Sequence, residues 1–358
     1  MSKILYAAST MSHINNFHQS YINALRRDGH EVLVMARGED ADFDIPFVKK
    51  MFSPKNAACC ARIRKIIKRE KFDTIILNTA LAAFLVRLAM PKRRRPRVVN
   101  IVHGYLFPEH LGSSKAKLLL KCEKMMTKKT DSIIVMNEED LRIAKEHKLC
   151  LGDICVIDGM GAKTRAEVSP AAKIRKYIES EGKYVLSFVG ELSDRKNQRF
   201  LICALPEIKI AIPNAVLWLI GAGGGRDELI DLAEKLGLSD SVYFIGQTEI
   251  PCDFIRASDL YVSSSEIEGM PFNIIEALGT GKTILASNIK GHTDLIKDGE
   301  SGFLYEYGNI TEFVKKVKQI HDGELVADPE KIKEAYERYS YDNVYPKTCA
   351  VIKEAIKG

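Results

Sequence analysis

Short apolar segments alternate with amphipathic segments along this chain, and the alternation starts again after its middle. Residues 3–9 have the pattern of a buried strand, residues 16–27 that of an amphipathic helix, and residues 31–36 that of a second strand. Strand, loop, helix, strand is the order of a parallel α/β sheet. The order begins again at residues 184–189. Since 358 residues exceed a typical single domain, the sequence predicts two α/β domains.

A segment rich in small and polar residues separates the two halves. It is DGMGAKTRAEVSP at residues 158–170, which is typical of a linker. We therefore expect an N-terminal domain at residues 1–165 and a C-terminal domain at residues 166–340. Further strands are predicted at 72–77, 97–102, 131–135 and 153–157 in the first domain and at 216–220, 242–246, 259–262 and 283–286 in the second, and terminal helices at 329–338 and 341–356.

Several classes of protein are excluded by composition. No run approaches the roughly 18 uninterrupted apolar residues of a membrane span. The N-terminus MSKILYAAST reads as a first strand rather than a signal peptide, so we expect a cytoplasmic protein. The eight cysteines show no Cys-x-x-Cys spacing. In a reducing compartment they are expected to be free thiols rather than ligands of structural zinc.

The net charge is +6, and basic residues gather in the first half of the chain. Three clusters are formed by Arg62, Arg64, Lys65, Lys68, Arg69 and Lys71; by Lys92, Arg93, Arg94, Arg95 and Arg97; and by Lys115, Lys117, Lys121, Lys124, Lys128 and Lys129. No nucleic-acid-binding module accompanies them, so no nucleic acid partner is expected. An anionic membrane surface and solvated helix faces both explain these clusters.

The stretch SSEIEGMPFNIIEALGTG, residues 264–281, carries the strongest chemical signal. Pro271 fits the first turn of a helix, whose unpaired N–H groups and dipole favour a phosphate. Glu268 and Glu276 would repel that anion, so they are better suited to accept hydrogen bonds from hydroxyl groups. A molecule with phosphates at its centre and sugars on both sides fits this layout, as nucleotide sugars do. The alternative is that Glu268 caps the helix and Glu276 is an ordinary surface residue.

The longer segment from residue 264 to 305 resembles the signature of glycosyltransferase family 4. The matched features are Glu268-Gly269, Glu276-Ala277, Gly281, Gly291 with Asp294, and Gly299 to Gly302. The resemblance covers nearly the whole chain and implies a retaining enzyme with the GT-B fold, an α/β architecture of two Rossmann-like parallel-sheet domains facing a central cleft. It also implies that the C-terminal helix, residues 341–358, packs back on the first domain.

The resemblance implies roles for residues of both domains. IVHGYLF and SIIVMNEED are similar to segments of bacterial exopolysaccharide and capsule glycosyltransferases, which implies that His103 contacts the donor sugar near the reacting centre. His13, in the loop after the first strand, either lines the acceptor side or is a structural turn residue. His292 either faces the donor or is structural.

In the second domain the resemblance assigns contacts with the donor. Glu276 would hold the ribose and Glu268 the transferred sugar, while Lys196 would stabilise the leaving diphosphate. Arg195 either helps Lys196 in this, in place of the positive charge missing at position 191, or is a surface residue of a polar loop. Similar enzymes carry Arg where this chain has Glu191. The remaining donor contacts are expected at Gly190, Gln247, Gly269, Met270, Pro271 and Phe272.

The predicted function is retaining transfer of a hexose or N-acetylhexosamine from a nucleotide-diphosphate sugar, in the first place a UDP-sugar, to a lipid-linked saccharide in bacterial surface polysaccharide synthesis. The protein would work at the inner face of the cell membrane. No cofactor and no metal are expected, since Asp42-Phe43-Asp44 lies in an early polar loop. A nucleotide-sugar 2-epimerase and a non-catalytic binding protein of the same fold remain alternatives. An NAD-dependent oxidoreductase would need a glycine fingerprint that STMSHIN lacks.

Overall fold

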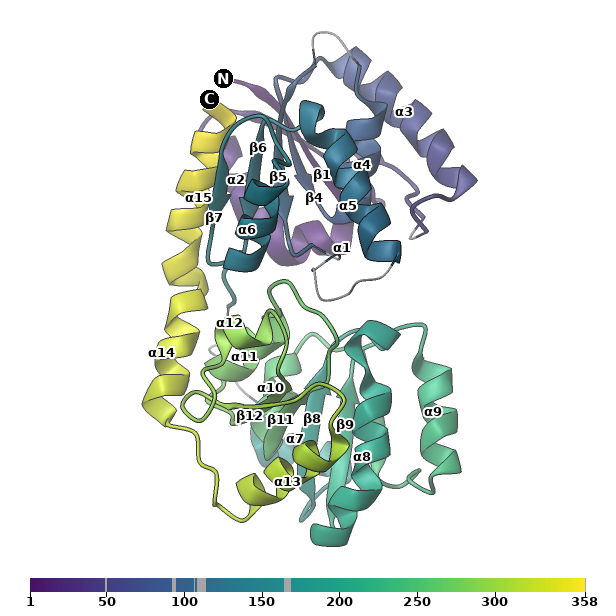
Figure 1. Cartoon of the computed structure of the whole chain (residues 1–358), viewed down its shortest axis with the longest axis vertical. Helices are drawn as coiled ribbons and strands as arrows, with labels where there is room; N and C mark the ends of the chain where they lie inside the picture. The colour runs from purple at the N-terminus through teal and green to yellow at the C-terminus, as the bar shows by residue number, and fades with distance from the viewer. Residues whose placement is uncertain (49, 92–94, 106, 108–113, 164–168, 358) are drawn as a thin grey trace. The chain divides into compact units, whose positions relative to one another are not determined.

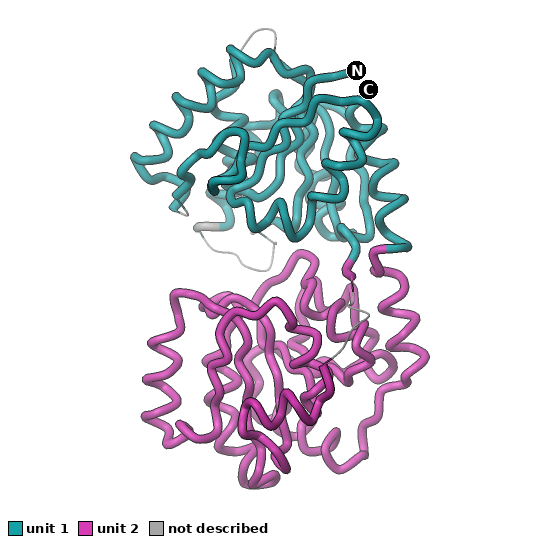
Figure 2. Tube along the Cα trace, turned by 180° about the vertical axis from the view of Figure 1, so that it is seen from behind, with its two compact units in different colours: residues 1–161, 342–358 teal, residues 162–341 magenta. Residues whose placement is uncertain are grey.

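The computed structural model describes residues 1–48, 50–91, 95–105, 107, 114–163 and 169–357. The chain divides into two compact units (Figure 2). Unit 1 comprises residues 1–161 and 342–358, and unit 2 comprises residues 162–341. The boundary that we expected at residue 165 lies outside the described residues.

Unit 1 contains a seven-stranded parallel sheet with the order β3-β2-β1-β4-β5-β6-β7. Its strands are β1 (Lys3–Thr10), β2 (Glu31–Arg37), β3 (Phe43–Asp44), β4 (Thr74–Asn78), β5 (Arg97–Val102), β6 (Ser132–Val135) and β7 (Ile154–Val156). The helices are α1 (Met11–His13), a π-helical turn (Ile14–His18), α2 (Gln19–Arg27), α3 (Pro54–Glu70), α4 (Ala80–Ala89), α5 (Ser114–Met126), a 3-10 turn (Thr127–Lys129), α6 (Glu138–Glu146) and α15 (Tyr341–Lys357).

Burial of apolar side chains explains why these strands form the centre of the unit. β4 is buried at all five positions, as expected for a strand covered on both faces. Helices α3, α4 and α5 contribute to one apolar cluster on one side of the sheet, in which Ile63, Leu85 and Met126 are buried together.

Helix α15 packs on unit 1, although it is the last element of the chain (Figure 1). Arg97 of β5 donates its Nε–H to the backbone oxygen of Ala355 at 2.7 Å. Lys353 forms an ion pair with Asp28 at 2.7 Å. The C-terminal helix is therefore part of the same folded unit as the N-terminal strands.

Unit 2 contains a six-stranded parallel sheet with the order β10-β9-β8-β11-β12-β13. Its strands are β8 (Tyr184–Val189), β9 (Ala215–Ile220), β10 (Val242–Gly246), β11 (Leu260–Ser263), β12 (Ile284–Ser287) and β13 (Phe303–Tyr305). The helices are α7 (Ala171–Tyr177), a 3-10 turn (Asp194–Lys196), α8 (Gln198–Ala211), α9 (Arg226–Lys235), α10 (Pro251–Ala257), α11 (Phe272–Gly279), α12 (His292–Leu295), α13 (Ile310–His321) and α14 (Pro329–Tyr339).

The prediction of two α/β domains with parallel sheets is confirmed, and the predicted strands differ from the observed ones by two residues or fewer. Strands β3 and β13 were not predicted, and Phe43 and Asp44, expected in a polar loop, form the short edge strand β3 because they pair with β2. The helix predicted at residues 16–27 is different. Helical structure begins at Met11, where Thr10 caps the first turn by accepting a hydrogen bond from the His13 N–H. It then widens into the π-helical turn before continuing as α2.

Candidate functional site

The expected donor residues gather at the carboxyl edge of the unit 2 sheet. Strand order reverses between β8 and β11, which have β9 and β12 on their outer sides. At such a switch point the loops after the two central strands leave in opposite directions and open a crevice. The loop after β8 carries Gly190, Arg195 and Lys196, and the loop after β11 carries residues 264–271. Asn273 connects the two loops by donating to the backbone oxygen of Val189 at 2.8 Å.

Glu268 forms ion pairs with both cations that were expected at the leaving diphosphate. Its Oε1 lies 2.5 Å from Lys196 Nζ, and its Oε2 lies 2.9 Å from Arg195 Nη1. Arg195 also donates to the backbone oxygen of Ile267. Lys196 and Glu268 are buried, whereas the Arg195 side chain is 40% exposed. The three groups carry a net charge of +1, which suits a site for an anion.

These ion pairs keep Glu268 ionised. Burial alone would raise the pKa of the Glu268 carboxyl, but Lys196 and Arg195 together lower it to about 2. Each carboxylate oxygen has a second lone pair, so Glu268 can still accept a hydrogen bond from a sugar hydroxyl.

Glu276 lies in α11 in a contrasting environment. No hydrogen bond or ion pair joins it to another side chain in the described part of the chain. Burial without a partner raises its pKa to about 7. A half-buried carboxyl group that lacks a partner is available to a ligand with hydroxyl groups.

Close backbone contacts require glycine at two positions around this edge. A Cβ atom at Gly221, after β9, would lie 2.0 Å from the backbone oxygen of Gly190. A Cβ atom at Gly291 would lie 2.8 Å from Glu268 Cβ. Gly291 has a φ of +87°, which L-residues rarely adopt. It therefore allows the loop before α12 to approach Glu268.

The other expected donor residues are placed around the same edge. Gly190 follows β8, Gln247 follows β10 and is exposed, and the run from Gly269 to Phe272 leads into α11. Glu191 is exposed. His292 is fully buried, where its Nδ1 lies 2.8 Å from the backbone oxygen of Ser287 and its Nε2 lies 3.1 Å from Ser263 Oγ. These contacts identify His292 as a structural residue of the site.

In unit 1, His13 and His103 are brought together with a third histidine, His18. His18 Nε2 lies 3.2 Å from His13 Nε2 and 3.1 Å from His103 Nε2. Burial lowers the pKa of His13 to about 4 and that of His18 and His103 well below the usual value, so all three imidazoles are neutral near pH 7. His18 was not selected as a site residue from the sequence, because no motif includes it.

The backbone of the His103 loop is held by an acidic residue of α6. Asp140 accepts hydrogen bonds from the Tyr105 N–H at 3.3 Å through both carboxylate oxygens. The Asn137 side chain caps α6 by accepting from the Asp140 N–H at 2.8 Å. The segment SIIVMNEED thus positions the loop after β5.

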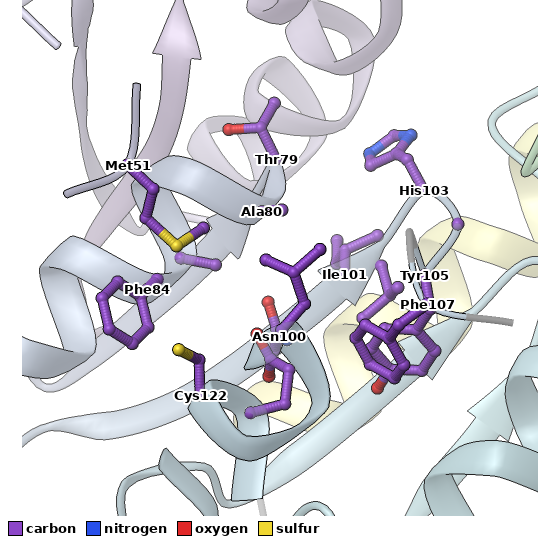
Figure 3. A pocket seen from close by; sticks show the side chains of 15 residues that line it. Met51, Thr79, Ala80, Phe84, Asn100, Ile101, His103, Tyr105, Phe107 and Cys122 are labelled. Atoms are coloured by element: carbon purple, nitrogen blue, oxygen red, sulfur yellow. The ribbon is translucent and has the colours of Figure 1, made fainter. Parts of the chain in front are cut away.

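Beside His103 lies a cavity of about 160 Å³ that sequence reasoning missed (Figure 3). Its lining is mostly apolar and comes from α4, β5, α5 and the loop after β5, including Phe84, Tyr105 and Phe107. Figure 3 shows His103 at the margin of this group of side chains. The lining residues are far apart in sequence, so no local pattern indicates them.

The three basic clusters contain both solvent-exposed side chains and side chains that are bonded within the fold. On α3, Arg62, Arg64, Lys65, Lys68 and Arg69 are exposed, and on α5, Lys117, Lys121 and Lys124 are exposed together with Leu118 and Met125. Lys92, Arg93 and Arg94 lie outside the described residues. Arg95 forms two hydrogen bonds with the Asp131 carboxylate, at 2.5 and 2.7 Å, and Arg97 bonds to α15. Grouping Arg95 and Arg97 with surface charges was therefore wrong.

Among the described helices, none combines the length and the apolar character that crossing a membrane requires.

Comparison with known proteins identifies two matching family models. Glycosyltransferase Family 4 matches residues 16–158, and Glycosyl transferases group 1 matches residues 171–339. EpsD of Bacillus subtilis (strain 168), provisionally named a glycosyltransferase, is 32% identical over 332 residues, which are 89% of this chain and 87% of EpsD.

Two further proteins are similar over most of the chain. The UDP-Gal:alpha-D-GlcNAc-diphosphoundecaprenol alpha-1,3-galactosyltransferase of Escherichia coli is 29% identical over 271 residues, covering 73% of this chain and 70% of that protein. The crystal structure of Anabaena HepE in complex with UDP and glucose has a TM-score of 0.78, covers 99% of this chain and 100% of HepE, and is 20% identical. This last likeness concerns the fold, which is GT-B.

Proposed function

The chain belongs to glycosyltransferase family 4, and we propose that it is a retaining enzyme that transfers a hexose or N-acetylhexosamine from a UDP-sugar to a lipid-linked saccharide during bacterial surface polysaccharide synthesis. The observation that carries the proposal is the ion-paired group of Glu268, Lys196 and Arg195 beside the unpaired Glu276 at one sheet edge. The names of two similar proteins, one with a UDP-Gal donor and one solved with UDP and glucose, support a UDP-sugar.

In this proposal the donor lies along the carboxyl edge of the unit 2 sheet. Glu276 accepts hydrogen bonds from the ribose hydroxyls, and Glu268 accepts one from the transferred sugar. The diphosphate lies at the first turn of α11, next to the residues from Gly269 to Phe272. Gln247 and Gly190 belong to loops that contact the nucleotide.

Lys196 would carry the main electrostatic role in the reaction. Negative charge develops on the leaving diphosphate as the bond to the sugar breaks, and a fixed cation nearby lowers the energy of that state. Glu268 holds the Lys196 ammonium group in place at 2.5 Å. Since no side chain that the structure describes at this edge is suited to be a covalent nucleophile, we propose attack by the acceptor on the same face, with the leaving phosphate as base. No metal ion on the diphosphate is needed in this scheme.

The acceptor side is proposed to lie in unit 1 at His13, whose ring centroid lies 4.6 Å from that of His103; His103, proposed to contact the transferred sugar, lines the apolar cavity. The name of the Escherichia coli relative includes a diphosphoundecaprenol-linked sugar, which supports a lipid-linked acceptor. On α5, Leu118 is 46% exposed and Met125 is 61% exposed, between exposed lysines. Apolar side chains among basic ones suit the interface of an anionic membrane.

The donor assignment is tested by calorimetry and thermal unfolding with UDP, GDP, ADP and their sugars, each with and without EDTA. We expect stabilisation by UDP compounds that EDTA does not change. Glu276→Ala should weaken binding about 10–100-fold, because a hydrogen bond to a charged group contributes about 1.5–3 kcal/mol. Glu234→Ala, an exposed glutamate of α9, is the matched control. Absence of binding to every nucleotide sugar would refute the proposal.

Membrane attachment is tested by pelleting with phosphatidylglycerol vesicles. Replacing Lys117, Lys121 and Lys124 of α5 by Gln should weaken binding on the order of 100-fold, at about 1 kcal/mol per basic residue. Replacing the exposed Lys235, Lys315 and Lys333 of unit 2 changes the net charge equally and should leave pelleting unchanged. Equal effects of the two triple variants would rule out a specific membrane surface on α5.

A further inference from the structure

The three imidazoles of unit 1 converge in a way that hydrogen bonding among them does not explain. A neutral imidazole has one N–H and one lone pair. His18 Nε2 faces the Nε2 atoms of both His13 and His103, at 3.2 and 3.1 Å. If His18 Nε2 carries the proton, its single N–H would have to be donated to both partners. If it does not, its single lone pair would have to accept from both. Ordinary hydrogen bonds among the three imidazoles therefore do not account for both short contacts of His18 Nε2.

The distances from His18 Nε2 to the Nε2 atoms of His13 and His103 are those between ligands around one metal ion. Two nitrogens bound to a tetrahedral Zn²⁺ at about 2.0–2.1 Å lie about 3.3–3.4 Å apart. The observed distances are 3.1 and 3.2 Å, and the ligand atoms of all three histidines lie within 4.8 Å of one another. Three N–H groups directed at one anionic oxygen would instead lie about 4.6 Å apart. The geometry therefore favours a cation over an anion.

A second group orients the central ligand. The Tyr6 hydroxyl lies 2.9 Å from His18 Nδ1, and both residues are fully buried. When Nδ1 donates its proton to this hydroxyl, Nε2 carries the lone pair and faces the other two histidines. Outer hydrogen bonds of this kind fix the tautomer and ring orientation of histidine ligands in metalloproteins.

The backbone conformation of residues 14–18 also brings the histidines together. In an α-helix, positions five residues apart point about 140° away from each other. Between His13 and His18 the chain instead forms the π-helical turn, closed by the bond from the Gln19 N–H to the Ile14 oxygen. Such wide turns are rare and occur frequently at functional sites. Here the turn brings His13 and His18 to within contact of each other and of His103, which enters from β5.

We propose that His13, His18 and His103 form a binding site for a divalent transition-metal ion of the zinc type, ligated through their three Nε2 atoms. Three protein ligands leave a fourth position open for water or for an oxygen of a bound molecule. His13 and His103 are only half-buried, so an ion can reach the site. This proposal departs from the expectation, drawn from the sequence, that the protein holds no metal. It goes beyond the proposed sugar transfer and does not depend on it.

The test is metal binding by the full-length protein after removal of metals with a chelator. Co²⁺ and Zn²⁺ are titrated, bound metal per chain is measured after desalting, and the visible spectrum of the Co²⁺ form is recorded. We expect one tightly bound ion per chain and the intense visible bands of four-coordinate Co²⁺. A Cys155→Ser background removes the one exposed cysteine among the described residues as a competing ligand.

Four variants make the test specific. His13→Ala and His18→Ala should lose stoichiometric binding, and Tyr6→Phe, which keeps all three ligands, should weaken binding about 10–100-fold. His321→Ala, an exposed histidine of unit 2, should bind as the wild type does. Because His18 is buried, folding of each variant is checked by circular dichroism, and the half-buried His13 gives a second, milder change. Binding that survives both His13→Ala and His18→Ala, or absence of binding by the wild type, would overturn the proposal.

Discussion

Lys196 Nζ and Glu268 Oε1 lie 2.5 Å apart although 72 residues separate them in the chain. The lysine follows β8 and the glutamate follows β11, and these strands are neighbours at the point where the strand order of unit 2 reverses. Both side chains are nearly buried, so each charge depends on the other for its stability. The position of the lysine that we assign to the diphosphate is thus determined by the carboxylate that we assign to the sugar.

Removing Lys196 should destabilise the protein much more than removing Arg195. Lys196→Met leaves the buried Glu268 carboxylate without its nearest cation, which should lower the free energy of unfolding by about 3 kcal/mol or more. Arg195→Met removes the same charge from a side chain that is 40% exposed, where an ion pair contributes about 0–1 kcal/mol. Urea unfolding of both variants measures the difference. Equal losses would mean that burial does not strengthen the Lys196 pair.

The stability of the protein should fall in acid because of Glu268. Its pKa is about 2 in the folded protein, compared with 4.5 for an ordinary glutamate. The stabilisation is therefore complete above pH 4.5 and is lost as the pH falls towards 2, since the unfolded chain takes up the proton first. The difference in pKa corresponds to about 3 kcal/mol. The free energies of unfolding of the wild type and Glu268→Gln, measured between these pH values, should converge at the acid end. A constant difference between the two proteins would contradict the prediction.

Local pattern was sufficient to predict every described strand except β3 and β13, because each of the others is a short apolar run between polar turns. The motifs also singled out Glu268, Glu276 and Lys196, which the structure places at one edge of the unit 2 sheet, while their roles in donor binding stay predictions. The pairing of Lys196 with Glu268 could not be predicted in the same way, because it depends on strand order. The same reason applies to Arg95, whose basic neighbours suggest a surface cluster but whose partner, Asp131, comes from the loop before β6.

The histidine cluster could be predicted only in part, because it depends on a local backbone conformation that the sequence does not indicate. His13 and His103 were selected because each follows a strand, and parallel strands bring their carboxyl ends to one edge. His18 was not selected; it lies inside the helix predicted at residues 16–27, whereas His13 lies in the loop before it, and in an ordinary helix positions five residues apart point to different sides. The π-helical turn at residues 14–18 changes that relation, and it was not predicted from the sequence.

Donor binding should become stronger as the pH rises through about 7. Burial raises the pKa of Glu276 to about 7, and the ionised carboxylate is the better acceptor for two ribose hydroxyls. UDP-glucose is the suitable ligand, because both ends of its diphosphate are esterified and neither titrates in this range. Calorimetry from about pH 6 to about pH 8, which is roughly one pH unit on either side of that pKa, should show the increase in affinity for the wild type and not for Glu276→Gln. A rise of equal size in both proteins would assign the titration to another group.

Gly291 should be required for donor binding, and a second glycine provides the control. Gly291 has a φ of +87° and Gly299 a φ of +78°, so alanine at either position should cost about 1–2 kcal/mol of stability through backbone strain. A Cβ atom at Gly299 meets nothing within 4 Å, whereas one at Gly291 would lie 2.8 Å from Glu268 Cβ and 3.1 Å from its backbone oxygen. We expect a larger loss in urea unfolding for Gly291→Ala than for Gly299→Ala, and weaker binding of UDP-glucose in Gly291→Ala alone, because only that change displaces Glu268 from Lys196. If both variants bound the donor as the wild type does, the position of Glu268 would not matter for binding.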